Sequence, residues 1–258
     1  FPVTLPSQDM PSSGDVIPGL TVIDDSLMAF MEKWGVPGGQ LAISKDGKIV
    51  YSRAFGYADK DNKIPINTGN LMRIASVSKS ITGVAVMKLI QYRKQKLYDK
   101  PLDILKNFSP PNGTIKDPRW REITVEQLLE HTGGFSLENG DRQVTYLRKA
   151  ADAFGTPRPA TTRQIIEYGM GEMLDFEPGT KYVYSNFGYN ILGRIIEKIS
   201  GKTYEQYVRD EILAPAGVTD MVIAKTRLRD KLPNEVIYYG NPMYEPMWSV
   251  LDDPEQVN

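Results

Sequence analysis

Ser76–Gln91, with the sequence SVSKSITGVAVMKLIQ, is the stretch from which the fold of this chain can best be argued. Its apolar residues recur at helical spacing, so the stretch predicts a largely apolar helix. Ser76 and Lys79 stand three positions apart, and residues at that spacing share one face of a helix. The predicted helix therefore presents a hydroxyl beside an ammonium group in its first turn.

Before this helix the sequence predicts another helix and two strands. Residues 20–34 carry apolar side chains at helical spacing and run into a stretch rich in Gly and Pro at 35–39. Two apolar runs, 40–44 and 49–52, flank the Asp-Gly pair of 45–48, which is a strong signal for a β-hairpin. Two strands make a poor sheet on their own, so further strands should be supplied from elsewhere.

After the Ser76 helix the pattern is mainly helical. Thr124 is a plausible cap, with Gln127 three residues on, and further helices are predicted at 162–173, 187–200 and 204–212. The pattern predicts an α/β fold of the α+β type, with an antiparallel sheet flanked by helices and an all-α lobe. The expected divisions are an extended segment at 1–19, the first part of the α/β lobe at 20–80, a mainly helical lobe at 81–234, and an incomplete return to the α/β lobe at 235–258, where 235–240 is a candidate strand.

Composition excludes several classes of function. Lys and Arg number 31 against 32 Asp and Glu, so the chain lacks the excess of positive charge that would favour binding to nucleic acid or a membrane surface. No apolar run is long enough to predict a transmembrane segment. The chain has no cysteine, which excludes disulfides, thiolate metal sites and a cysteine nucleophile. Its single histidine, His131, cannot build a multi-imidazole zinc site, and no metal or organic cofactor is implied.

Ser76 and Lys79 form the first candidate catalytic pair. A serine hydroxyl is a weak nucleophile that needs a base, and a desolvated lysine can supply one. The free N–H groups of a first helical turn favour an oxyanion formed there. The alternative is that Ser-x-x-Lys occurs by chance, because the pattern alone is common. Ser78 is a weaker candidate nucleophile, since it lies one residue from Lys79 and faces elsewhere.

Tyr184 and Asn186 form the second candidate group, on a loop between turn residues and a predicted helix. A tyrosine near ammonium groups has a lowered pKa and can relay protons, and an amide can hold both a substrate and a lysine. The alternative is a simple turn with Asn as a helix cap. His131 is either a general base or a residue near a helix end closed by Gly133, and we favour the structural role because two other proton carriers exist.

Together these residues resemble the serine β-lactamase and penicillin-binding-protein superfamily, and most of all its branch of class C β-lactamases, D-alanyl-D-alanine carboxypeptidases and family VIII esterases. The resemblance covers residues 22–221. Each short pattern is weak alone, whereas the ordered set is specific. The runs that carry it are, in order, Val36-Pro37-Gly38, Phe55-Gly56-Tyr57-Ala58, Ser76-Val77-Ser78-Lys79, the LLEHTGG of 128–134, Pro178-Gly179-Thr180 and Tyr184-Ser185-Asn186-Phe187-Gly188-Tyr189.

The resemblance implies a β-lactamase/transpeptidase-like fold and a role for each matching residue. Ser76 would become the acyl carrier, and its backbone N–H would form half of the oxyanion hole. Lys79 would activate Ser76, and Tyr184 would pass protons to the leaving group and help to activate water. Asn186 would bind substrate and Lys79. His131 would be structural. Which of Lys79 and Tyr184 is the true base stays open.

The sequence departs from the family in one place. The family carries a third motif, Lys-Thr-Gly or His-x-Gly, after the Tyr-x-Asn loop, but here the only His-x-Gly stands at His131, before Tyr184. The final strands of the family also have no counterpart, so we expect the C-terminal strands to be missing from this chain. A second chain made by cleavage, a truncated chain and an inactive homologue are the three explanations. We favour the first two, because Ser76, Lys79, Tyr184 and Asn186 are all present and the apolar Ser76 helix needs a full sheet to cover it.

The leading hypothesis is a serine hydrolase that acts on esters, amides or D-amino-acid peptides through an acyl-enzyme. The alternatives are an acyltransferase with the same intermediate and a non-catalytic assembly or binding homologue. Expected partners are a small-molecule or short-peptide acyl substrate and, if cleavage has occurred, the protein's own C-terminal segment as a second chain. The N-terminal stretch 1–19, which does not begin with Met, is typical of an end left by leader removal or of an artificial boundary. The first explanation favours export to the periplasm or beyond.

Overall fold

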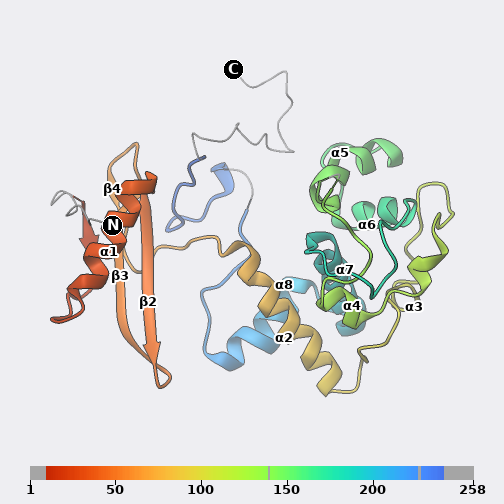
Figure 1. The fold of residues 1–258 in the computed structure, drawn as a ribbon, viewed down its shortest axis with the longest axis horizontal. Coiled ribbons are helices and arrows are strands. Elements are labelled where there is room, and N and C mark those ends of the chain that lie inside the picture. The colour runs from red at the N-terminus through yellow and green to blue at the C-terminus, as the bar shows by residue number, and fades with distance from the viewer. Residues whose placement is uncertain (1–9, 139, 226–227, 241–258) are drawn as a thin grey trace. The chain divides into compact units, whose positions relative to one another are not determined.

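The computed structural model describes residues 10–138, 140–225 and 228–240 (Figure 1). By its internal contacts the chain divides into two compact units. Within the described residues the first, the sheet unit, comprises 10–73 and 224–240, and the second, the helical unit, comprises 74–223. Among those residues no helix has both the length and the apolar character that a membrane span requires. The mixed helical and antiparallel-sheet architecture confirms the predicted fold class.

The sheet unit is built on the predicted hairpin. The sheet has the order β1-β3-β2, with β4 paired to β3 and every pairing antiparallel. Asp46 and Gly47 both have positive φ, 51° and 73°, which matches the right-handed twist of the strands that they join. The elements of this unit are β1 (Ser12–Ser13), α1 (Thr21–Trp34), β2 (Gly38–Lys45), β3 (Lys48–Asp59), β4 (Ile64–Pro65) and the short turn η5 (Leu228–Asp230).

A buried ion pair joins α1 to β3 in this unit. Arg53 donates to the carboxylate of Asp24, and the two side chains are only 6% and 9% exposed. Tyr51 donates to the same carboxylate at 2.5 Å. Burial, reinforced by that hydrogen bond, raises the pKa of Tyr51 to about 12, so the phenol stays protonated.

The candidate strand at 235–240 is only partly confirmed. Glu235 forms one isolated parallel bridge with Leu71, and the Ile237 N–H donates to the Ala58 carbonyl at 2.8 Å. No regular ladder extends from them within the described residues. The further C-terminal strands that we expect to be missing stay a prediction, because residues 241–258 lie outside the described part of the chain.

The helical unit contains most of the helices in the described part of the chain. Thr124, Thr161 and Thr203 each open a helix with a capping box, in which the threonine hydroxyl and a glutamine three residues on satisfy backbone N–H groups reciprocally. Its elements are η1 (Ala75–Val77), α2 (Ser78–Gln91), α3 (Pro101–Ile104), η2 (Pro118–Arg121), α4 (Val125–Leu129), α5 (Arg142–Phe154), α6 (Thr162–Met170), α7 (Asn186–Ser200), α8 (Tyr204–Tyr207), the π-helical η3 (Val208–Leu213) and η4 (Ala214–Ala216).

Helix α7 supplies much of the core of this unit and packs against α2, α4, α5 and α6. The Phe187 ring near its first turn is fully buried, with its centroid 4.9 Å from that of Phe135. Gly169 on α6 allows this packing, because a Cβ there would lie 2.5 Å from the Phe187 ring. Asn186, the last residue of the Tyr-x-Asn pattern, is the first residue of this packed helix.

Four details differ from the sequence-based predictions. Helix α5 was not expected, and α6 ends at Met170 rather than at residue 173. The predicted helix 204–212 splits into α8 and η3. Finally, the chain reverses after α4 at His131, whose φ is +60°, and not at Gly133. The Thr132 N–H donates back to the Gln127 carbonyl at 2.8 Å, which is the closing bond of a Schellman motif.

Candidate active site

Ser76 and Lys79 lie on the turn that leads into α2. Ser76 is exposed and belongs to η1, while Lys79 is the second residue of α2. Lys79 Nζ is 3.4 Å from Ser76 Oγ, so the predicted neighbourhood of hydroxyl and ammonium is present. Ala75, directly before the serine, has a φ of +43°, a left-handed conformation that costs an alanine ~1–2 kcal/mol. Such strain is typical of segments that hold a functional side chain in place.

Tyr184 and Asn186 reach the same two residues from the start of α7. Tyr184 OH lies 2.6 Å from Ser76 Oγ, and Lys79 Nζ donates to Asn186 Oδ1. Lys79 Nζ also lies 4.6 Å from the centre of the Tyr184 ring. All four predicted site residues therefore meet within the helical unit, although the two pairs are more than a hundred positions apart in the sequence.

The tyrosine is electrostatically distinct within this group. The hydrogen bond from Lys79, followed by the one with Ser76, lowers the pKa of Tyr184 below its ordinary value. A positive charge beside a phenol stabilises the phenolate, and partial burial does not outweigh that effect here. A tyrosine with a lowered pKa is ionised in a larger fraction of molecules, and only the phenolate can accept a proton from a neighbouring hydroxyl.

His131 contacts the tyrosines of this site and the backbone of the Tyr-x-Asn loop. Its ring packs against those of Tyr184 and Tyr189, at 4.8 and 4.9 Å between centroids. The Ser185 N–H donates to Nδ1 at 3.0 Å, which requires an unprotonated Nδ1. Burial, and then the charge of Lys79, lower the pKa of His131, so the imidazole is neutral at pH 7. The histidine acts as an acceptor that holds the Tyr-x-Asn loop.

Asp141 is a site neighbour that the sequence analysis missed. Its Oδ2 accepts from Asn186 Nδ2 at 2.8 Å and from the Asn186 N–H at 3.3 Å. Asp141 is also the N-cap of α5, where its Oδ1 accepts from the Gln143 N–H at 2.8 Å. An Asp before a helix is a recognisable cap signal, but nothing in the sequence connects it with Asn186, 45 positions away.

The fold and this arrangement define a class of protein. An antiparallel-sheet unit, a helical unit, and Ser-x-x-Lys and Tyr-x-Asn patterns that meet at helix starts are typical of serine β-lactamases and penicillin-binding proteins. The chain belongs to the beta-lactamase family, whose family model matches residues 23–254.

Curated relatives agree with this placement. A putative D-alanyl-D-alanine carboxypeptidase of Escherichia coli (strain K12) is 30% identical over 252 residues, covering 86% of this chain and 56% of the relative. Protein flp of Staphylococcus aureus (strain MW2) is 30% identical over 215 residues, covering 81% of this chain and 39% of the relative. The chain thus spans about half the length, or less, of these relatives.

Solved structures show the same fold. The octameric penicillin-binding protein homologue from Pyrococcus abyssi matches with a TM-score of 0.66 and 27% identity, over 84% of this chain and 47% of that one. EstCE1, a hydrolase with promiscuous acyltransferase activity, matches with a TM-score of 0.61 and 24% identity, over 80% of this chain and 55% of that one. At that identity the second likeness supports the fold alone.

Proposed function

We propose that this protein is a serine hydrolase that forms an acyl-enzyme on Ser76. The observation that carries the proposal is the network in which Ser76 Oγ meets Tyr184 OH at 2.6 Å while Lys79 stands beside both. A nucleophile within hydrogen-bonding reach of a base, with the base held by a third group, is the arrangement that covalent catalysis needs. Membership of the beta-lactamase family supports hydrolase chemistry of this kind.

The geometry favours Tyr184 over Lys79 as the proton acceptor. The serine hydroxyl is closer to the phenol oxygen, at 2.6 Å, than to the ammonium nitrogen, at 3.4 Å. The pKa of Tyr184 is lowered by the same lysine. In the proposed step Tyr184 starts as a phenolate stabilised by the charge of Lys79, and it takes the Ser76 proton and becomes a neutral phenol as Oγ attacks the substrate carbonyl.

The remaining steps follow from the same groups. Tyr184 returns the proton to the leaving oxygen or nitrogen, which departs and leaves an ester on Ser76. Water then attacks this ester and gives a proton to Tyr184. Tyr184 passes that proton to Ser76 Oγ as the acid leaves, which restores the serine hydroxyl. The Ser76 backbone N–H would supply one oxyanion donor. The second donor would come from the family's third-motif strand, which has no counterpart after Tyr184 in this sequence.

Esters, amides and D-amino-acid peptides are the substrate classes that we propose. The carboxypeptidase name of the Escherichia coli relative supports D-alanyl-D-alanine peptides among them. Comparing release of D-alanine from such a peptide with cleavage of a p-nitrophenyl ester would rank the classes. Adding amine or alcohol acceptors to the same reactions would show whether an acceptor replaces water and makes the enzyme an acyltransferase.

The decisive test is covalent labelling of Ser76. Wild-type protein and Ser76→Ala are exposed to a fluorophosphonate, and their intact masses are compared. We expect one adduct on the wild type and none on the alanine variant, a loss of at least ~10³-fold in labelling rate. Ser78→Ala is the matched control, because it removes a hydroxyl two residues away and should label like the wild type. An unlabelled wild type would overturn the proposal, and the non-catalytic binding or assembly homologue would then be the remaining explanation.

A further inference from the structure

The side-chain amide of Asn186 has a donating end and an accepting end, and its environment decides which of them faces Lys79. An ionised carboxylate can only accept hydrogen bonds. Because Asp141 Oδ2 receives the Nδ2 group at 2.8 Å, the amide must turn its Oδ1 away from Asp141 and toward Lys79 Nζ. We propose that Asp141 is a positioning residue that sets the orientation of Asn186 and so the place of Lys79; its catalytic consequence rests on the function proposed above.

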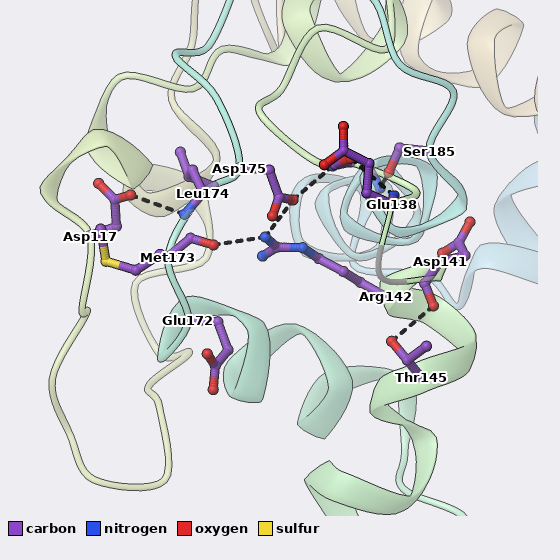
Figure 2. A network of polar contacts seen from close by, with 12 residues as sticks. Asp117, Glu138, Asp141, Arg142, Thr145, Glu172, Met173, Leu174, Asp175 and Ser185 are labelled. Carbon is purple, nitrogen blue, oxygen red and sulfur yellow. Dashed lines mark hydrogen bonds and ion pairs between the residues drawn. The ribbon is translucent and has the colours of Figure 1, made fainter.

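Asp141 is itself held firmly. Its backbone carbonyl accepts from the Thr145 N–H at 2.9 Å and from Thr145 Oγ1 at 3.1 Å, as the first turn of α5 requires (Figure 2). The next residue, Arg142, is 6% exposed and donates to the Met173 carbonyl and to Asp175 Oδ2, each at 2.7 Å. Figure 2 shows the guanidinium reaching from the start of α5 to these two groups. These contacts anchor the first turn of α5, at whose N-cap the Asp141 carboxylate stands.

The same carboxylate lies at the start of α7. The Asn186 N–H, a free donor of that first turn, points to Asp141 Oδ2 at 3.3 Å. A negative charge is favourable at that end of a helix dipole. The Asp141 carboxylate thus accepts hydrogen bonds from the first turns of both α5 and α7 and from the side-chain amide of Asn186. A rigid acceptor of this kind can keep Asn186 from flipping when a substrate enters.

Two other roles for Asp141 predict different effects of substitution. If it were only the cap of α5, then Asn and Ser, which cap about as well as Asp, would leave the site unchanged, and Ala alone would do harm. If it acted only through its charge, which raises the pKa of Tyr184, its removal would lower that pKa and assist proton transfer. Positioning alone predicts a loss of activity in every neutral variant.

The test compares Asp141→Asn, Asp141→Ser and Asp141→Ala by the rate of fluorophosphonate labelling. Asp141→Asn places an NH2 group where Asn186 needs an acceptor, which favours the flipped amide with its donors toward Lys79. We expect this variant to lose ~10²-fold, since misplacements near 1 Å can cost that much. Asp141→Ser keeps the cap but frees the amide, and we expect ~10-fold. Thr161→Ala, which removes the cap of α6 instead, is the control and should label normally. Wild-type rates in Asp141→Asn and Asp141→Ser would overturn the proposal.

A second readout does not depend on catalysis. The Nδ2 protons of Asn186 are assigned in a ¹⁵N spectrum by their disappearance in Asn186→Ser. We expect one of them to be protected from exchange in the wild type and unprotected in Asp141→Ser. Equal exchange in both proteins would overturn the positioning role. If the wild type failed to label but the protection followed Asp141, the function proposed above would fall while the orientation of Asn186 by Asp141 would stand.

Discussion

The sheet unit and the helical unit bury different kinds of side chain. In the described part of the sheet unit the buried apolar residues are the small cluster of Ala54, Ala58, Ile66 and Val236, together with Met31, Tyr51 and Phe55. The helical unit buries a much larger set, drawn from nearly all of its helices. Apolar burial stabilises by ~25 cal/mol per Å², so the helical unit gains far more from this source.

One polar cluster of each unit gives a second comparison. In the sheet unit, Asp24 and Arg53 are a closed and buried pair, with Tyr51 held protonated beside them. In the helical unit, Ser76 is exposed and Tyr184 has a lowered pKa. A charge that is fully paired holds elements together, whereas a charge set beside an exposed hydroxyl is available for chemistry.

The strongest test of this comparison is Phe187→Ala. Removing a ring that packs on Phe135 and faces Gly169 should lower the free energy of unfolding by ~3–5 kcal/mol, because the cavity does not close completely. Urea denaturation followed by circular dichroism measures it. Phe187→Leu is the matched control and should cost much less, since it keeps most of the apolar volume. A loss below ~1 kcal/mol would mean that apolar packing does not dominate the helical unit.

A second test breaks the sheet unit instead. Asp24→Asn leaves the Arg53 charge buried without its partner, which typically costs ~3 kcal/mol or more. Hydrogen exchange measured by mass spectrometry should show β2 and β3 losing protection while α7 keeps its own. Asp25→Asn makes the same charge change one position along α1 and should leave exchange unchanged. Equal loss of protection in α7 would show that the two units do not differ in how much their stability depends on this ion pair.

The smallest expected effect concerns pH and His131, the chain's single histidine. Its pKa in the folded protein lies below the ordinary value of 6.5, so the unfolded chain binds a proton first as pH falls. Its contribution to stability is therefore complete above pH 6.5 and is lost on acidification toward its lowered pKa. Asp117 titrates in a separate window, because Arg119 lowers its pKa to about 2.

Urea denaturation at several pH values between 5 and 7.5 measures this effect. His131→Asn should flatten the slope of stability against pH, since asparagine tolerates the left-handed backbone at this position but does not titrate. An identical slope in the variant would show that His131 is not held neutral by the fold.

Local patterns explain which elements could be predicted. The Asp46-Gly47 turn and the Thr124 capping box depend on residues within a few positions, and both predictions are confirmed. Helix α5 was missed although it carries local helix signals, namely the cap Asp141 and the helical spacing of Leu147, Ala150, Ala151 and Phe154. The turn at His131 was misplaced because glycine is the usual left-handed residue at a helix end, whereas here a histidine takes that conformation.

The sequence by itself determined the family, the hairpin, and the pairing of Ser76 with Lys79, because three residues on a helix are enough to set one beside the other. Only the tertiary structure decided that Tyr184 meets Ser76 across 108 positions, and that Asp141 turns the amide of Asn186 toward Lys79. Such contacts depend on how α2, α5 and α7 pack together. Hydrogen bonds act over about 3 Å, so which distant groups they join is decided by that packing and by no local pattern.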